Sequence, residues 1–251
     1  GVPCIVEEET LREAGISLPI IVRNPSFWTY ELMIEYELEP EIYSFTGLKE
    51  FIAALDRMGV SNYSVHIKID SGMHRLGFTP DEIPELISML KQNKMIKVRS
   101  IFSHLAASDE TEHDNFTQHQ IDTFSKTCNE LAQAIGYTPI RHILNTGGIE
   151  RYPNAQFDMV RLGIGLYGIS STQQDKLMPV STLKSRIIQV KQLNEGETIG
   201  YSRKGKVTRP TTVITIPIGY ADGLNRKLSN GVGKMLVKGR LAPTIGNISM
   251  D

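Results

Sequence analysis

Residues 63–70 read Tyr-Ser-Val-His-Ile-Lys-Ile-Asp, and this stretch decides the fold class. Alternate residues of a strand point to opposite faces. One face therefore carries the aliphatic residues Val65, Ile67 and Ile69, and the other carries the polar residues Ser64, His66, Lys68 and Asp70. Lysine and aspartate inside a covered sheet are costly unless they are paired. The stretch indicates either a paired polar row within a covered sheet or an exposed edge strand.

Short apolar runs and stretches of helical period alternate on both sides of this strand. The runs are 19–22, 40–43, 63–69, 98–103, 141–144 and 159–169, and the helical stretches are 27–36, 48–58, 81–92 and 118–135. Strands that alternate with helices predict a parallel sheet. Six strands fit either an open doubly wound sheet or most of an eight-stranded (β/α)8 barrel. No G-x-G-x-x-G follows the early strands, which disfavours a dinucleotide site.

The pattern of apolar runs changes near residue 177. The runs 183–192, 213–217, 234–237 and 242–245 are short, are mostly rich in β-branched residues, and are separated by Gly, Pro and Asn. This pattern predicts an all-β module. We therefore expect one domain over 1–176 and a second over 177–251.

Composition excludes several functional classes. The net charge of −1 gives no electrostatic case for binding nucleic acid or an anionic membrane. No apolar run approaches the roughly 18–20 residues needed to cross a bilayer, and no signal peptide is visible. Cys4 and Cys128 make neither a disulfide framework nor a metal site, so a reduced, cytoplasmic setting is expected.

Polar residues and glycines gather where the predicted strands end. His104 follows the run 98–103, and Asn145-Thr146-Gly147-Gly148 follows 141–144. In the last run, Arg161, Gly163 and Gly165 share one face if 159–169 is a strand. Glycine lets a ligand approach the backbone and exposes N–H donors to a phosphate. Because barrels of this type commonly bind phosphate at their last strands, we expect a phosphate site there.

Seven segments together resemble the alanine racemase family in order and approximate spacing. They are 68–77, 103–104, 145–146, 159–168, 198–201, 216–223 and 246–251. The resemblance implies an N-terminal (β/α)8 barrel that binds pyridoxal 5'-phosphate (PLP), followed by a mostly-β domain. It also implies a head-to-tail homodimer in which each active site combines one barrel with the partner's β domain.

The resemblance assigns roles near the cofactor. Arg161 resembles the arginine that donates to the pyridine nitrogen of PLP, and His104 resembles an imidazole bonded to that arginine. Gly163, Ile164 and Thr146 are similar to the groups that hold the phosphate, with Asn145 in the same shell.

The remaining roles concern the substrate. Arg75, Met250 and Asp251 resemble residues near the substrate carboxylate, and Lys68 matches a lysine that is carbamylated in some members and then orients Arg75. Tyr201 resembles the catalytic tyrosine, which acts on the partner's site. The residues that resemble the lining of the substrate corridor are Tyr220, Arg226 and Asp109. No metal is expected. The implied activity is the interconversion of L- and D-alanine by a lysine and a tyrosine, one on each face of the substrate, which supplies D-alanine for peptidoglycan.

One departure from the family keeps other interpretations open. The motif that carries the family's cofactor lysine is not found, so we expect a central fragment that lacks both family termini. The alternatives are a related racemase of serine or of broad specificity, a decarboxylase of the same barrel family, and an inactive PLP-binding chain.

Overall fold

The computed structural model describes residues 5–251, which form two compact units. The first unit ends at Val180 and the second begins at Ser181. The expected boundary lay four residues earlier, between 176 and 177. No helix among the described residues is long and apolar enough to cross a membrane.

The first unit is built on a five-stranded parallel sheet. Its strands follow the chain order: β1 (Ile21–Val22), β2 (Glu39–Ile42), β3 (Tyr63–Lys68), β4 (Ile96–Phe102) and β5 (Ile140–His142). Strand β3 pairs with β2 on one side and with β4 on the other. The edge-strand alternative for residues 63–70 is therefore wrong, and the paired polar row is confirmed.

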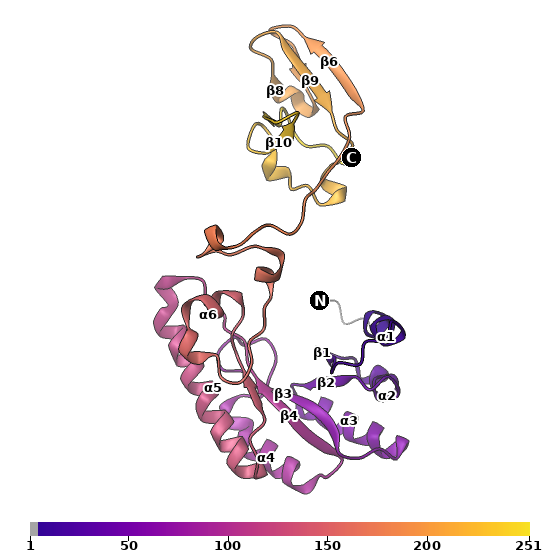
Figure 1. Ribbon diagram of the computed structural model, residues 1–251, viewed down its shortest axis with the longest axis vertical. Coiled ribbons are helices and arrows are strands. Elements are labelled where there is room, and N and C mark those ends of the chain that lie inside the picture. Colours follow the sequence, from indigo (N-terminus) through magenta and orange to yellow (C-terminus); the bar gives the residue numbers. More distant parts are fainter. Residues whose placement is uncertain (1–4) are drawn as a thin grey trace. The chain divides into compact units, whose positions relative to one another are not determined.

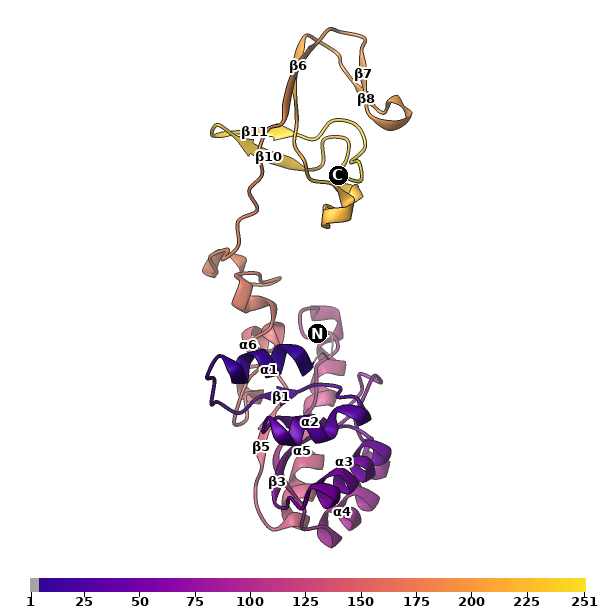
Figure 2. The ribbon, with the colours of Figure 1, turned by 90° about the vertical axis from the view of Figure 1, so that its right-hand side faces the viewer.

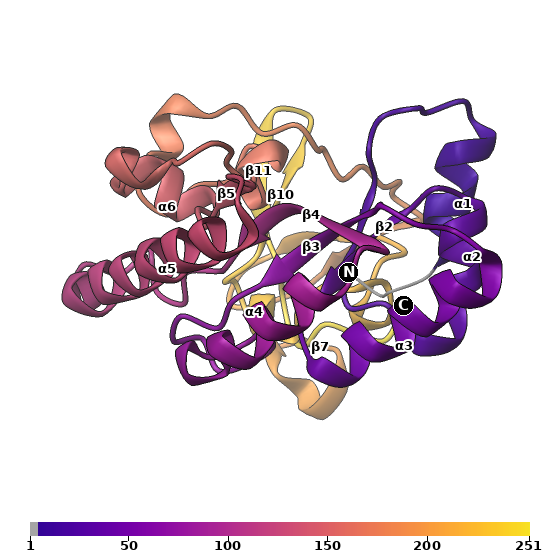
Figure 3. The same cartoon turned by 90° about the horizontal axis from the view of Figure 1, so that it is seen from below.

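Of the α-helices of this unit, the first precedes β1, the last follows β5, and the four between them connect the strands and cover one face of the sheet. These α-helices are α1 (Ile5–Glu13), α2 (Tyr30–Glu35), α3 (Phe45–Met58), α4 (Ile83–Gln92), α5 (Asp114–Ile135) and α6 (Thr146–Arg151). Helix α2 contacts α3, and α4 contacts α5, so these four follow one another around the sheet (Figures 1 and 3). The predicted stretches 27–36, 48–58, 81–92 and 118–135 all lie in helical segments, which confirms the strand–helix alternation.

Local sequence fixes the ends of these helices. The Ser44 hydroxyl accepts a hydrogen bond from the Gly47 N–H and begins α3, and Gly59, with φ of 65°, ends it. Between the helices and the sheet lies a core that includes Phe51, Ile67 and Phe124, each fully buried. Cys128 is also buried there, which raises the pKa of its thiol to about 12. Cys4 lies outside the described residues.

The sixth predicted strand is wrong. Residues 159–163 form no strand, and Ile164–Tyr167 form a short 3-10 helix that Gly168, with φ of 76°, ends. The backbone N–H groups of Gly163 and Gly165 donate to the Thr146 hydroxyl instead of to a neighbouring strand. The strand-face argument for Arg161, Gly163 and Gly165 therefore fails, although these residues still lie near one another.

The second unit is mostly β, as predicted, and Figure 2 shows its strands. Strand β6 (Gln189–Leu193) pairs antiparallel with β9 (Thr211–Thr215), and β10 (Lys234–Val237) pairs antiparallel with β11 (Arg240–Pro243). The sequence analysis did not predict the short pair β7 (Thr198–Ile199) and β8 (Gly205–Lys206). The predicted run 183–192 is a strand only from Gln189 onward.

Candidate active site

The face of the sheet opposite the helices carries a row of buried polar side chains. Glu39 and Glu41 lie on β2, His66 and Lys68 on β3, Ser100 on β4 and His142 on β5. The strand register places Glu41 opposite His66, and His66 opposite Ser100. Neighbouring strands therefore present polar atoms to one another across this inner face.

Arg161 is the most extensively bonded residue at the carboxyl end of the sheet. Its Nη1 donates to Nδ1 of His142 at 2.6 Å and to the His142 carbonyl at 3.0 Å. Its Nη2 lies 2.5 Å from the Ser103 carbonyl, 3.0 Å from the Ile143 carbonyl and 3.3 Å from Nδ1 of His104. The ends of β4 and β5 thus hold the guanidinium from both sides.

The Nε–H of Arg161 is the guanidinium donor that has no partner among residues 5–251. Burial, with a smaller effect from the charge of Arg23, lowers the pKa of Arg161 to about 10, so the group remains a cation at neutral pH. Arg161 can therefore offer one fixed N–H to a ring nitrogen acceptor.

The two histidines that contact Arg161 are neutral. Burial and then the Arg161 charge lower the pKa of His104 to about 4 and that of His142 to about 3. His104 lies where β4 gives way to a loop, as the sequence predicted, and its Nδ1 accepts from Arg161. The predicted pairing of His104 with Arg161 is present in the structure.

The Thr146 side chain, at the start of α6, accepts hydrogen bonds from two backbone N–H groups. Its Oγ1 accepts from the Gly163 N–H at 3.2 Å and from the Gly165 N–H at 3.1 Å. The side chain of Asn145 accepts from the Gly148 N–H at 3.0 Å and from the Ser108 hydroxyl at 2.6 Å. Asn145 thereby shapes the turn, and a phosphate oxygen would have to replace the Thr146 hydroxyl as the acceptor of these glycine N–H groups.

Lys68 pairs with a residue that the sequence analysis did not identify. Its Nζ lies 2.8 Å from Oε1 of Glu41, and both side chains are buried. Burial lowers the pKa of Lys68, and the Glu41 carboxylate opposes that shift. Arg75 is exposed on the loop after β3, so the partner in contact with Lys68 is Glu41 rather than Arg75.

Asp109 is the corridor candidate of the first unit. It is exposed, and a Cβ on Gly147 would lie 3.2 Å from its own Cβ. The loop after β4 therefore meets the first turn of α6 at Asp109.

The second unit brings three other candidates together. The Arg226 guanidinium lies 5.5 Å from the centroid of the Tyr220 ring, and the Ala221 N–H donates to the Met250 carbonyl at 2.9 Å. Tyr201 projects from a short 3-10 turn after Gly200 and is 71% exposed, and Asp251 is also exposed. Tyr220 and Arg226, two of the residues predicted to line the corridor, therefore lie close together, and Met250, predicted near the substrate carboxylate, lies beside Tyr220.

Sequence analysis missed several residues of the inner face. Glu39, Glu41, Arg99 and Ser100 have no role in the sequence-based predictions, and His142 appears there only within the predicted strand 141–144. The available signal was the alternation Glu39-Pro40-Glu41-Ile42, which places two carboxylates on one face of a buried strand. The predicted strand 40–43 begins one residue after Glu39, so it does not include both carboxylates.

Comparison with known proteins identifies the family. The chain matches the family models "Alanine racemase, N-terminal domain" over residues 1–171 and "Alanine racemase, C-terminal domain" over residues 180–251. It is 35% identical to alanine racemase of Cutibacterium acnes over 255 residues, covering 100% of this chain and 68% of that protein.

Solved structures agree with this family match. Alanine racemase from Streptomyces coelicolor A3(2) superimposes with a TM-score of 0.90 at 28% identity, over 98% of this chain and 67% of that one. The Bartonella henselae enzyme with covalently bound pyridoxal phosphate gives a TM-score of 0.83 at 27% identity, over 99% and 68%. The chain thus spans about two thirds of the length of its relatives. Its parallel sheet corresponds to part of their TIM-barrel-like domain, and the chain belongs to the alanine racemase family of PLP-dependent racemases.

Proposed function

We propose that this chain binds PLP and interconverts L- and D-alanine. The observation that carries the proposal is the anchoring of Arg161. Four of its five N–H groups are directed at the ends of β4 and β5, and Nε–H remains for an acceptor. The pyridine nitrogen of PLP is such an acceptor, and an arginine partner leaves that nitrogen unprotonated. His104, bonded to the same guanidinium, would lie beside the ring.

The glycine N–H groups support the position of the other end of the cofactor. We assign the phosphate to the N–H groups of Gly163 and Ile164 and to the Thr146 hydroxyl, with Asn145 holding the turn. Gly165 leaves little space, because a Cβ there would lie 2.8 Å from Cγ2 of Thr146. When bound, PLP draws electrons from the α-carbon of the amino acid and makes its proton acidic.

The second unit is proposed to supply most of the groups that act on alanine, and the first unit the others. Tyr201 is proposed to move a proton at one face of the α-carbon, with a lysine acting at the other face. Arg75, Met250 and Asp251 would hold the substrate carboxylate, and Tyr220, Arg226 and Asp109 would line its entry. We propose a head-to-tail homodimer, because the exposed Tyr201 then reaches the site of the partner. The bacterial cytoplasm is the proposed location, and D-alanine for peptidoglycan is the proposed product.

Carbamylation of Lys68 stays a prediction. A carbamate would place a second negative charge beside Glu41, so the Lys68–Glu41 ion pair competes with it. Native mass spectrometry checks this directly. A mass increase of one CO2 that disappears in Lys68→Met establishes carbamylation, and its absence from freshly purified protein in bicarbonate counts against it.

The experiment that tests the function measures D-alanine by chiral chromatography after the natural protein that contains this chain is incubated with PLP and L-alanine, because the motif of the family's cofactor lysine is not found in residues 1–251. We expect D-alanine to form, and we expect Tyr201→Phe to lower the rate by about a hundredfold, because the phenol moves the proton. The control is Tyr137→Phe, whose hydroxyl bonds to the Val98 N–H at the amino end of β4.

Three results distinguish the alternatives. PLP that binds without producing D-alanine would identify an inactive cofactor-binding chain. Faster racemisation of serine than of alanine would identify a related racemase. Borohydride treatment followed by peptide mapping locates any lysine to which PLP is attached.

A further inference from the structure

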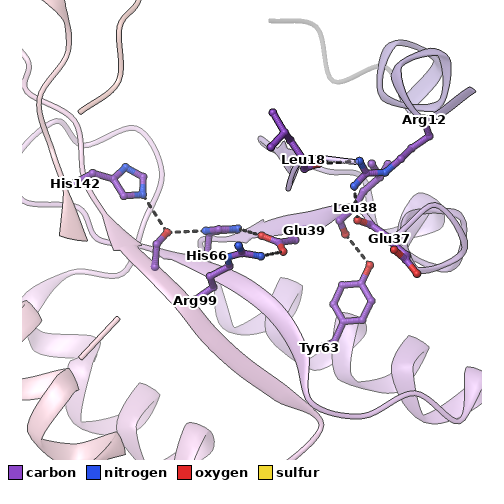
Figure 4. A network of polar contacts seen from close by, with 10 residues as sticks. Arg12, Leu18, Glu37, Leu38, Glu39, Tyr63, His66, Arg99 and His142 are labelled. Atoms are coloured by element: carbon purple, nitrogen blue, oxygen red, sulfur yellow. Dashed lines mark hydrogen bonds and ion pairs between the residues drawn. The ribbon is translucent and has the colours of Figure 1, made fainter. Parts of the chain in front are cut away.

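A continuous series of hydrogen bonds crosses the inner face of the sheet and ends at Arg161. Figure 4 shows its far part, from Arg99 through Glu39 and His66 to His142. Nε2 of His66 lies 2.8 Å from the Glu39 carboxylate, and Nδ1 of His66 lies 2.6 Å from the Ser100 hydroxyl. Ser100 in turn lies 3.0 Å from Nε2 of His142, whose Nδ1 contacts Arg161. The series joins β2, β3, β4 and β5.

The direction of the series can be read from its Arg161 end. A guanidinium can only donate, so Nδ1 of His142 must be an unprotonated acceptor. His142 is 1% exposed and neutral, which places its single ring proton on Nε2. That Nε2–H therefore donates to the Ser100 hydroxyl.

Ser100 transmits this direction to the next strand. Its hydroxyl is buried, and its side-chain partners among the described residues are the two imidazoles. Because Nε2 of His142 is a donor, the hydroxyl proton of Ser100 points to Nδ1 of His66. His66 then carries its proton on Nε2 and donates it to Glu39. Every bond in the series is donated away from Arg161.

Glu39 ends the series as a buried anion. Its carboxylate is 8% exposed and also forms a close ion pair with Arg99. Burial alone would raise the pKa of Glu39, but the hydrogen bonds and charges of His66 and Arg99 lower the pKa below its usual value. A carboxylate accepts hydrogen bonds and cannot donate them, so it favours the arrangement in which His66 is the donor.

We propose that Glu39 is a positioning residue that fixes the orientation of Arg161 through His66, Ser100 and His142. The anion on β2 selects one arrangement of protons, and that arrangement leaves Nδ1 of His142 as a permanent acceptor for Arg161. The inference deepens the proposed function, because Arg161 is the residue assigned to the cofactor ring. Glu39 itself does not touch cofactor or substrate.

The test is NMR of the 15N-labelled full chain without PLP, comparing wild type with Glu39→Gln. A glutamine side chain is neutral and adds a donor, so it no longer selects one arrangement. We expect the wild-type His142 and His66 rings to be protonated on Nε2. In Glu39→Gln we expect the ring nitrogen signals of both histidines to shift and the Nη–H groups of Arg161, which bond to His142 and its neighbours, to exchange about tenfold faster. Glu37→Gln, two residues away and exposed, is the matched control and should change none of these signals.

Ser100→Ala separates transmission along the series from a general loosening of the fold. In this background the path is broken, so adding Glu39→Gln should no longer shift His142. Two results would overturn the proposal: a proton on Nδ1 of wild-type His142, or His142 and Arg161 signals in Glu39→Gln that match wild type.

Titration with PLP distinguishes this proposal from the proposed function. If the function holds, Glu39→Gln raises the PLP dissociation constant about tenfold relative to wild type. If the wild-type chain does not bind PLP, the proposed function fails, while the NMR result still decides the role of Glu39.

Discussion

The two faces of strand β3 are both buried, but they are stabilised in different ways. On the outer face, Val65 and Ile67 are fully buried in the apolar core under the helices. On the inner face, His66 and Lys68 are each 3% exposed, and each contacts a glutamate of β2. Apolar burial stabilises one face, and complementary charges and protons hold the other. Burial alone therefore does not distinguish the residues of the apolar core from those of the candidate site. The groups that each side chain contacts do distinguish them.

The largest expected effect is on the inner face, in Lys68→Met. The substitution leaves the buried Glu41 carboxylate without its close, buried ion pair and with only the half-exposed Arg23 guanidinium at 3.6 Å, so we expect the free energy of unfolding to fall by roughly 3–5 kcal/mol. Chemical denaturation followed by helical circular dichroism measures it, because the described α-helices all lie in the first unit. Lys68→Met combined with Glu41→Leu should recover most of the loss. A single variant as stable as this double variant would contradict the ion-pair account.

Lowering the pH is expected to reduce the free energy of unfolding by a smaller amount, through His142 on the inner face. The pKa of His142 is about 3 in the folded chain and near 6.5 when unfolded, so the unfolded state binds the proton first as pH falls. This stabilisation is complete above about pH 6.5 and is lost progressively toward pH 3. Between pH 7 and pH 5 we expect a loss of about 2 kcal/mol from this residue.

The groups around His142 keep it neutral over that pH range. Arg161 contacts its Nδ1, the Ser100 hydroxyl contacts its Nε2, and the Phe102 ring stacks on it with a centroid distance of 5.0 Å. Denaturation at a series of pH values measures the effect. In His142→Phe the loss between pH 7 and pH 5 should shrink, and an unchanged pH dependence in this variant would assign the effect to other groups.

The smallest effect is expected on the outer face, in Ile67→Val. Removing one methylene from a packed core costs about 1 kcal/mol, and the cost should be the same at pH 5 and pH 7. The same denaturation experiment measures it. A cost that varies with pH, or that exceeds the cost of Lys68→Met, would erase the proposed difference between the faces.

Sequence alone predicted those parts of the fold and site that are local. Alternation over residues 63–70 placed His66 and Lys68 on one face, and the strand ends located His104 and Thr146. Glu39, Glu41 and Ser100 could not be assigned in this way, because their roles depend on which residues of neighbouring strands face each other. The register that places Glu41 beside His66 is a tertiary property.

The segment 159–169 shows a second limit of pattern analysis. Its apolar alternation is typical of a strand, yet Gly163 and Gly165 direct their N–H groups to Thr146. A side-chain hydroxyl distant in sequence thus overrides the periodicity. The assignment of Arg161 was nevertheless correct in its pairing with His104, because that assignment rested on the combined motifs rather than on the strand face.

The loop that carries Arg75 has a consequence for the thermodynamics of the proposed binding of the substrate carboxylate. The backbone of this loop is already ordered: the Phe78 N–H donates to the Lys68 carbonyl and the Asp70 N–H donates to the Phe78 carbonyl, each at 2.9 Å. At Gly77, with φ of 124°, a Cβ would lie 2.6 Å from the Asp70 nitrogen, so the loop is held against the strand too closely for a side chain there. The conformational entropy of this backbone is therefore lost during folding and not during binding. Arg75 keeps only its rotamer freedom, about 2 kcal/mol, to lose when an anion arrives.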